Sequence, residues 1–120
     1  MEYVLLPTIV GGKVVEHMVR MKDASIMYSV IRNDVVGKRN LEESPGLVQA
    51  EVTHVDVPHR PSGQNQLVPV SCAIELTWRR PHSDSTHNTL FYVVPNGAID
   101  TDILLGYKDS GEGIAGVYTV

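Results

Sequence analysis

The chain has 120 residues, 42% of them hydrophobic and 20% charged, which is typical of one small globular domain spanning residues 1–120. Fourteen acidic residues against ten basic ones give a formal net charge of -4, and no basic run exceeds two residues, so the composition argues against nucleic acid as a partner. The sequence also lacks an apolar run near the roughly 18 residues of a membrane span and lacks the features of a signal peptide. We therefore expect an intracellular, cytoplasmic protein without a membrane partner.

The first two predicted strands form a hairpin. Apolar residues dominate positions 3–10, and the dipeptide Gly11-Gly12 that follows tolerates the positive φ angles of a tight two-residue turn. A second strand should follow immediately, with one face made of Val15, His17, Val19 and Met21. On this apolar face, His17 is expected to be a hydrogen-bonded, partly buried histidine and not a ligand or a base.

The clearest alternation in the chain covers residues 67–78, where Val, Cys, Ile, Leu and Trp side chains occupy every second position. At about 3.3 Å per residue this strand would be about 40 Å long, so we expect it to bend, or to project beyond the main sheet as one arm of a hairpin. Its partner is predicted at residues 48–57, across the polar, proline-containing connection 58–66. Cys72, the only cysteine, falls on the inward face and is expected to be a core thiol.

The remaining elements are predicted as strands, apart from one short helix. Residues 89–94 are β-branched and aromatic, residues 103–105 form an apolar run typical of a buried strand, and residues 117–120 are a candidate last strand. Turns are expected at 95–97 and at 100–102. The best helical candidate is 29–38. Together these patterns predict an all-β protein with at most one short helix.

Two histidine clusters share one spacing, His54-x-Asp56-x-x-His59 and His82-x-Asp84-x-x-His87. Residues i and i+2 share a face of a strand, so the histidine and aspartate of either cluster could chelate a metal ion together. Both clusters lie at predicted loop margins, however, where solvated histidines are common. We therefore predict no metal site and no cofactor.

Three stretches carry a resemblance to a known family. Residues 3–23 are predicted to form a hairpin that ends at Asp23. The segment Asp23-Ala24-Ser25, with the apolar pair Val30-Ile31, parallels an Asp-Thr-Gly-Ala-Ser-x-x-Phe-Ile pattern. The third stretch ends in Asp102-Ile103-Leu104-Leu105-Gly106, an apolar-apolar-Gly signature. In this order the stretches resemble the retropepsins, the small aspartic proteases of retroviruses and long-terminal-repeat retrotransposons, including fungal retroelement-derived relatives. The resemblance implies a small closed β-barrel of the retropepsin type.

The resemblance also implies a site and an assembly. In retropepsins each of two chains supplies one aspartate, and the pair shares a proton and activates a water, so catalysis through Asp23 would require a homodimer. Ala24 and Ser25 stand where the family has a hydroxyl residue and a glycine, which makes the catalytic triplet degenerate. By the same resemblance, the tip Pro61-Ser62-Gly63 corresponds to the flap that covers substrate. This tip and Gly106 are the expected substrate-binding residues.

Three functions are compatible with these observations. The leading hypothesis is a homodimeric retropepsin-like domain with weak or no protease activity, a pseudoprotease that acts in dimerisation or binds a peptide or protein segment. The first alternative is an active aspartic endopeptidase, a hydrolase that uses Asp23 from two chains. The second alternative is an unrelated β-barrel interaction domain.

Overall fold

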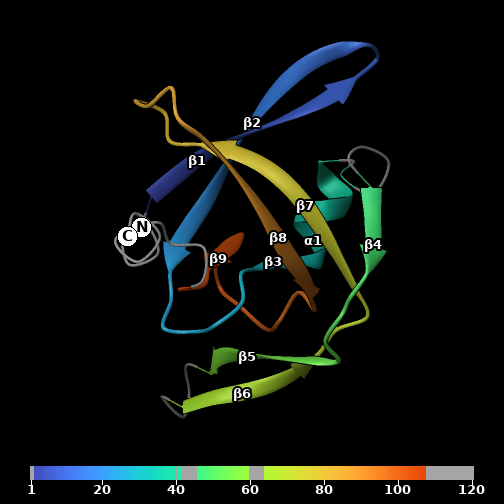
Figure 1. The fold of residues 1–120 in the computed structure, drawn as a ribbon, viewed down its shortest axis with the longest axis vertical. Coiled ribbons are helices and arrows are strands. Elements are labelled where there is room, and N and C mark those ends of the chain that lie inside the picture. Colours follow the sequence, from blue (N-terminus) through green and yellow to red (C-terminus); the bar gives the residue numbers. More distant parts are fainter. Residues whose placement is uncertain (1, 40, 42–45, 60–63, 108–120) are drawn as a thin grey trace, which may run out of the picture.

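The computed structural model describes residues 2–39, 41, 46–59 and 64–107, and within them the predicted all-β architecture is confirmed (Figure 1). The elements are β1 (Glu2–Val10), β2 (Lys13–Asp23), β3 (Val30–Arg32), α1 (Asn33–Lys38), β4 (Leu47–Gln49), β5 (His54–His59), β6 (Gln64–Pro69), β7 (Cys72–Arg79), β8 (Thr86–Val94) and β9 (Ile103–Leu105). Six strands close into a barrel in the order β1-β2-β9-β3-β8-β7, because β7 pairs back onto β1. Strand β4 extends this sheet from β7, and β5 and β6 form a separate two-stranded arm.

Strands β1 and β2 form the predicted hairpin. Their antiparallel pairing is continuous from Glu2 with Met21 to Val10 with Lys13, and the turn residues Gly11 and Gly12 have φ angles of 57° and 79°. Glycine adopts such angles without steric cost, which explains the dipeptide. Near its open end the hairpin buries one face in the barrel, whereas toward the turn it extends past the barrel (Figure 1). Val15, expected on the inner face, is exposed for this reason.

The long alternating stretch is divided, as its length predicts. Its first part, β6, pairs with β5, and its second part, β7, pairs with β8 and β4. The predicted partner breaks at the same level, and two backbone hydrogen bonds span the break: Val70 N–H to the Thr53 carbonyl at 2.9 Å, and Ala50 N–H to the Ser71 carbonyl at 3.1 Å. The β5–β6 arm therefore leaves the barrel as one unit and lies below it in Figure 1.

The helix predicted over residues 29–38 is wrong in its first half. Val30 and Ile31 belong to β3, buried between β8 and β9, and only Asn33–Lys38 form α1. These β-branched side chains fit a strand that is covered on both faces, and this tertiary pairing outweighs a weak local helical pattern. Strand β8 also begins at Thr86, ahead of the predicted Thr89.

The central strands β3, β8 and β9 are covered on both faces. On the inner face, Ile31 and Ile103 belong to the apolar cluster that fills the barrel. On the outer face, Val30 and Leu104 belong to a second cluster, to which the β5–β6 arm contributes Val55, Val57 and Val68. Double burial explains why residues 103–105 are apolar without alternation, and it confirms the predicted buried strand.

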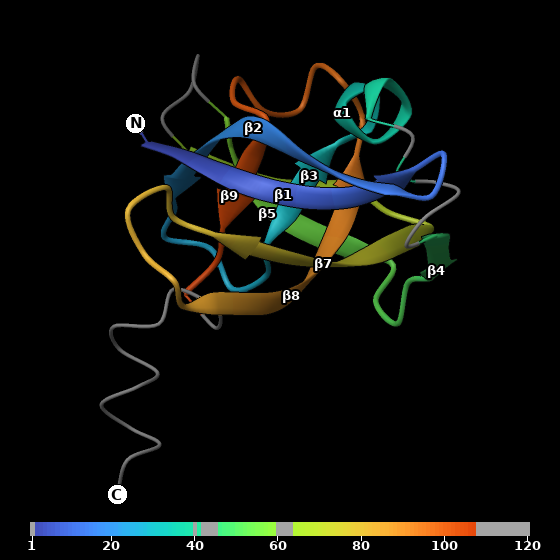
Figure 2. The same ribbon diagram turned by 90° about the horizontal axis from the view of Figure 1, so that it is seen from above.

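Strand β9 is inserted between β2 and β3. It runs parallel to β2, with Met21 beside Ile103 and Asp23 beside Leu105, and antiparallel to β3. The ends of β2 and β9 therefore lie together at one end of the barrel (Figure 2). The candidate last strand at residues 117–120 lies outside the described residues. No helix in the described part of the chain has the length and hydrophobicity that crossing a membrane requires.

Candidate functional site

A cavity of about 530 Å³ opens at the end of the barrel where β2 stops. In the described part of the chain, four segments far apart in the sequence line it: the end of β2 with the residues that follow, the β5–β6 arm, the loop before β9, and β9 itself. The lining residues are Lys22, Asp23, Ala24, Ser25, Pro58, Asn65, Gly97, Ala98, Ile99, Asp100 and Leu104. Ile99 and Leu104 are buried and form an apolar floor, whereas Asp23, Ser25 and Asp100 are exposed at the rim.

Asp23 is the last residue of β2 and is held by the backbone on the β9 side. It pairs with Leu105, and the next residue, Ala24, donates its N–H to the Leu105 carbonyl at 3.0 Å. A shift of Asp23 relative to β9 would break this ladder. The three residues predicted as the degenerate triplet, Asp23, Ala24 and Ser25, all line the cavity.

Gly106, expected as a substrate-binding residue, is not among the residues that line the cavity. It is buried, and its N–H donates to Ser29 Oγ at 2.9 Å, while the N–H of Tyr107 donates to the Ile26 carbonyl at 2.8 Å. A Cβ at position 106 would stand 2.6 Å from the Met27 carbonyl oxygen, a distance that real Cβ atoms essentially never show. Gly106 thus allows the loop after Asp23 to pack directly on the end of β9.

The β5–β6 arm forms a second wall of the cavity. Pro58 and Asn65 face each other across the two strands, and both line the cavity. The flap-like tip predicted at Pro61, Ser62 and Gly63 follows β5 in the sequence and lies outside the described residues. Among the described residues, the arm bounds the site beside Asp23 through Pro58 and Asn65.

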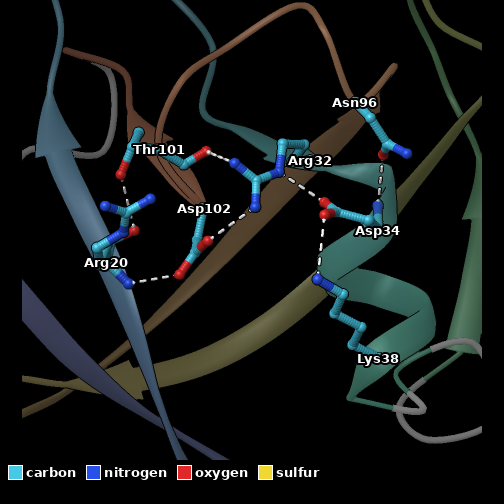
Figure 3. Close-up of polar contacts among 7 residues, drawn as sticks. All are labelled: Arg20, Arg32, Asp34, Lys38, Asn96, Thr101 and Asp102. Carbon is cyan, nitrogen blue, oxygen red and sulfur yellow. Dashed lines mark hydrogen bonds and ion pairs between the residues drawn. The ribbon is translucent and has the colours of Figure 1, made fainter.

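The third wall, residues 97–100, is anchored at both ends by polar contacts (Figure 3). At its start, Ala98 N–H donates to the Pro95 carbonyl at 3.0 Å, which closes the predicted turn. Asn96, directly before the wall, accepts the N–H of Asp34 through Oδ1 at 2.7 Å. Beyond it, Asp102 Oδ2 accepts the N–H of Arg20 at 2.9 Å. Asp102 Oδ1 accepts a hydrogen bond from Arg32 Nη2 at 3.2 Å. Strand β2 and α1 are thereby tied to the two ends of one cavity wall.

Arg32 links these anchors through a second carboxylate. Its Nε donates to Asp34 Oδ1 at 2.6 Å, and this bond lowers the pKa of Asp34 and raises the pKa of Arg32. The charge of Asp102 further raises the pKa of Arg32, and Lys38, with Nζ 3.6 Å from Asp34 Oδ2, further lowers that of Asp34. Sequence reasoning missed this network, because its members come from separate segments and carry no shared motif.

Two other residues singled out in the sequence have structural places away from the cavity. His17 is partly buried, with Nε2 2.8 Å from Thr8 Oγ1, as predicted. Burial, and then the positive charge of Arg39, lower the pKa of His17. Cys72 is a free thiol, partly buried against the barrel core.

The two histidine clusters do not converge among the residues described. His54 and Asp56 are exposed on β5, and His82 and Asp84 are exposed before β8. The His87 ring instead stacks on Trp78, with ring centroids 4.4 Å apart. Within the described ranges, no three His, Cys, Asp or Glu side chains are grouped closely enough to hold a metal ion.

The cavity combines an apolar floor with a polar rim, a combination that is common in ligand-binding sites. The rim offers carboxylates, an ammonium and a hydroxyl. Activation of water by paired carboxylates would require the Asp23 of a second chain. No protein-family model matches this chain, and no curated protein or solved structure is significantly similar to it.

Proposed function

We propose that this chain is a retropepsin-like homodimeric domain that binds a peptide or protein segment and has weak or no protease activity. The observation that carries the proposal is the cavity beside Asp23. Stretches that carry the resemblance to retropepsins meet at this place, namely the end of β2 with the triplet and strand β9. The arm that leads to the flap-like tip forms a further wall.

The reduced activity rests on the residues after Asp23. In the family, a Thr or Ser hydroxyl at the next position bonds across the dimer, and Ala24 has no hydroxyl to do so. Ser25 places a side chain where the family has glycine, in a cavity that the ligand must share. Lys22, also a lining residue, adds a positive charge directly beside Asp23 in the sequence. The cavity beside Asp23 and the arm that bounds it are both present, so peptide binding is the activity that the site supports best.

Cleavage of a diverse peptide library from acidic to neutral pH, monitored by mass spectrometry, tests the catalytic half of this proposal. We expect a dimer by light scattering and no more cleavage from the native chain than from Asp23→Asn. The double variant Ala24→Thr/Ser25→Gly should gain cleavage, because it restores the hydroxyl and the glycine, and the gain should disappear when Asp23→Asn is added.

Binding to the same library tests the other half. Peptides that bind the native dimer should perturb the backbone amide signals of residues 23–25 and 97–100. Cleavage by the native chain that is lost in Asp23→Asn would show an active endopeptidase instead. A monomer that binds no peptide at these residues would show an unrelated interaction domain.

A further inference from the structure

Strands β1 and β7 close the barrel through one pair of residues, Leu5 and Arg79. Toward the hairpin turn the two strands separate, and Figure 1 shows the β1–β2 hairpin leaving the barrel there. The space between them is a second cavity of about 220 Å³. Its lining includes Pro7, Ile9 and Val14 on the hairpin side and Glu75, Leu76 and Thr77 on the β7 side.

The direction of the β7 backbone follows from its neighbours. In an antiparallel pair the N–H and C=O of one residue point to the same edge, and successive residues alternate. Tyr92 N–H donates to the Ser29 carbonyl at 3.0 Å, so the backbone N–H and C=O of Tyr92 point away from β7. The N–H and C=O of its partner Ala73 therefore point away from β8. By alternation, the backbone N–H and C=O groups of Glu75 and Thr77 also point away from β8.

This edge of β7 is covered at its two ends and open between them. Strand β4 covers Ala73 and strand β1 covers Arg79. For Glu75 and Thr77, the pairings within residues 2–39, 41, 46–59 and 64–107 provide no strand on this side. Their backbone donors and acceptors therefore face the second cavity.

The side chains of the opposite wall are mostly apolar: Pro7, Ile9 and Val14 line it together with Thr8, whose Oγ1 is 2.8 Å from His17 Nε2. The pair Val10 and Lys13 closes the two-residue turn and is hydrogen bonded, so Ile9 and Pro7 direct their backbone away from β2. Pro7 has no N–H to leave unpaired there, as is typical of an edge strand. Ile9 and Val14 are 61% and 70% exposed. The cavity thus combines an open strand edge with a mostly apolar wall, which is the combination used in β-strand addition.

We propose that this groove binds an extended segment of a partner protein by strand addition to β7, and that the segment carries a basic residue next to an apolar one. A residue that exchanges hydrogen bonds with Glu75 has its side chain on the outer face, beside the Glu75 carboxylate. Glu75 is exposed and forms no ion pair with the described side chains, so a Lys or Arg there is complementary. The adjacent residue, opposite Leu76, points into the cavity, where an apolar side chain fits.

Amide hydrogen exchange measured by NMR tests the proposal directly. The probe is the heptapeptide acetyl-Thr-Val-Arg-Leu-Arg-Val-Thr-amide, which places an arginine beside Glu75 in either strand direction. In the free protein the amides of Leu76 and Trp78, bonded to β8, should exchange slowly, and those of Glu75 and Thr77 fast. At saturating peptide, exchange at Glu75 and Thr77 should slow by at least about fivefold, with Leu76 and Trp78 unchanged.

A charge swap supplies the matched control. The variant Glu75→Arg should bind the probe about fivefold more weakly and should prefer a peptide in which both arginines are replaced by glutamate. Methylation of both arginine backbone nitrogens should abolish binding, because these N–H groups face β7, whereas methylation at the leucine should not. Asp23→Asn should bind the probe like the native chain.

Three results would overturn the proposal. Slow exchange at Glu75 and Thr77 in the free protein would show that another part of the same chain, or a second copy of it, occupies the groove. Probe-induced changes confined to residues 23–25 and 97–100 would place the peptide in the first cavity. Equal binding of the probe by the native chain and by Glu75→Arg would show that recognition does not require a basic residue in the partner segment.

Discussion

Gly106 has no Cβ, and this absence allows the loop after Asp23 to pack against the end of β9. The loop after Asp23 reaches the end of β9 through the bond from Gly106 N–H to Ser29 Oγ, and the neighbouring carbonyl of Met27 occupies the place of a Cβ. Its φ angle is not in the left-handed region, so the requirement is for space and not for backbone freedom.

Gly106→Ala should lower the free energy of unfolding by about 1–3 kcal/mol, because the added carbon meets backbone that moves only with β9 or the loop. Urea denaturation measures the change. Gly37→Ala in α1 is the matched control, since a Cβ there meets nothing within 4 Å, and it should be neutral or slightly stabilising. Equal unfolding curves for the native chain and Gly106→Ala would show that the loop yields freely.

His17 makes the stability of the β1–β2 hairpin depend on pH. Its pKa in the folded chain lies below the ordinary value of about 6.5, so the unfolded chain binds the proton more readily. The stabilising contribution is therefore complete above that value and declines as the pH falls from it toward the folded pKa. When the pH is lowered through this window, the free energy of unfolding measured by urea denaturation should fall more for the native chain than for His17→Gln. An equal loss in both would contradict the assignment.

At the scale of elements, the loop between β8 and β9 is the part of the site with the most polar anchors. Asn96 ties its start to α1, and Asp102 ties its end to β2 and to Arg32. The cavity wall at residues 97–100 is short and lies between these anchors, so its position follows from the barrel. We therefore expect the cavity beside Asp23 to have this shape before a ligand binds.

Asp102→Ala should lower the free energy of unfolding by about 2 kcal/mol, because it removes a charged acceptor from Arg20 N–H and from the largely buried Arg32 guanidinium. Asp56→Ala, an exposed aspartate on β5, is the control and should change stability by less than about 0.5 kcal/mol. Thermal or urea unfolding measures both. A loss at Asp102 no greater than at Asp56 would mean that the wall is held by the backbone alone.

At the scale of the whole molecule, local signals were enough to predict the strands that depend on local chemistry. Gly11-Gly12 predicted the hairpin turn, the alternation over 67–78 predicted a divided strand, and the apolar run 103–105 predicted a buried one. The burial of Val30 and Ile31 between β8 and β9 could not be read locally, because their neighbours come from far along the chain. This is why a helix was predicted where β3 lies.

The candidate site was predictable in part for the same reason. Asp23, Ala24 and Ser25 were identified from a short motif, and they do line the cavity. The lining residues Pro58, Asn65 and Ile99 have no motif, and only the folded barrel brings them to Asp23. The apolar-apolar-Gly signature pointed to Gly106, but its close approach to the backbone of Met27 and Tyr28 depends on the fold and could not be read from the sequence.

The insertion of β9 between β2 and β3 also constrains how this protein folds. The β1–β2 hairpin is a local structure and can form early, but β2 and β3 are joined through residues 103–105, which leave the ribosome last among the described strands. Until they arrive, the facing edges of β2 and β3 stay open to other strands and to chaperones. Barrel closure thus relies on contacts of high sequence separation, which predicts slow folding for a chain of this size.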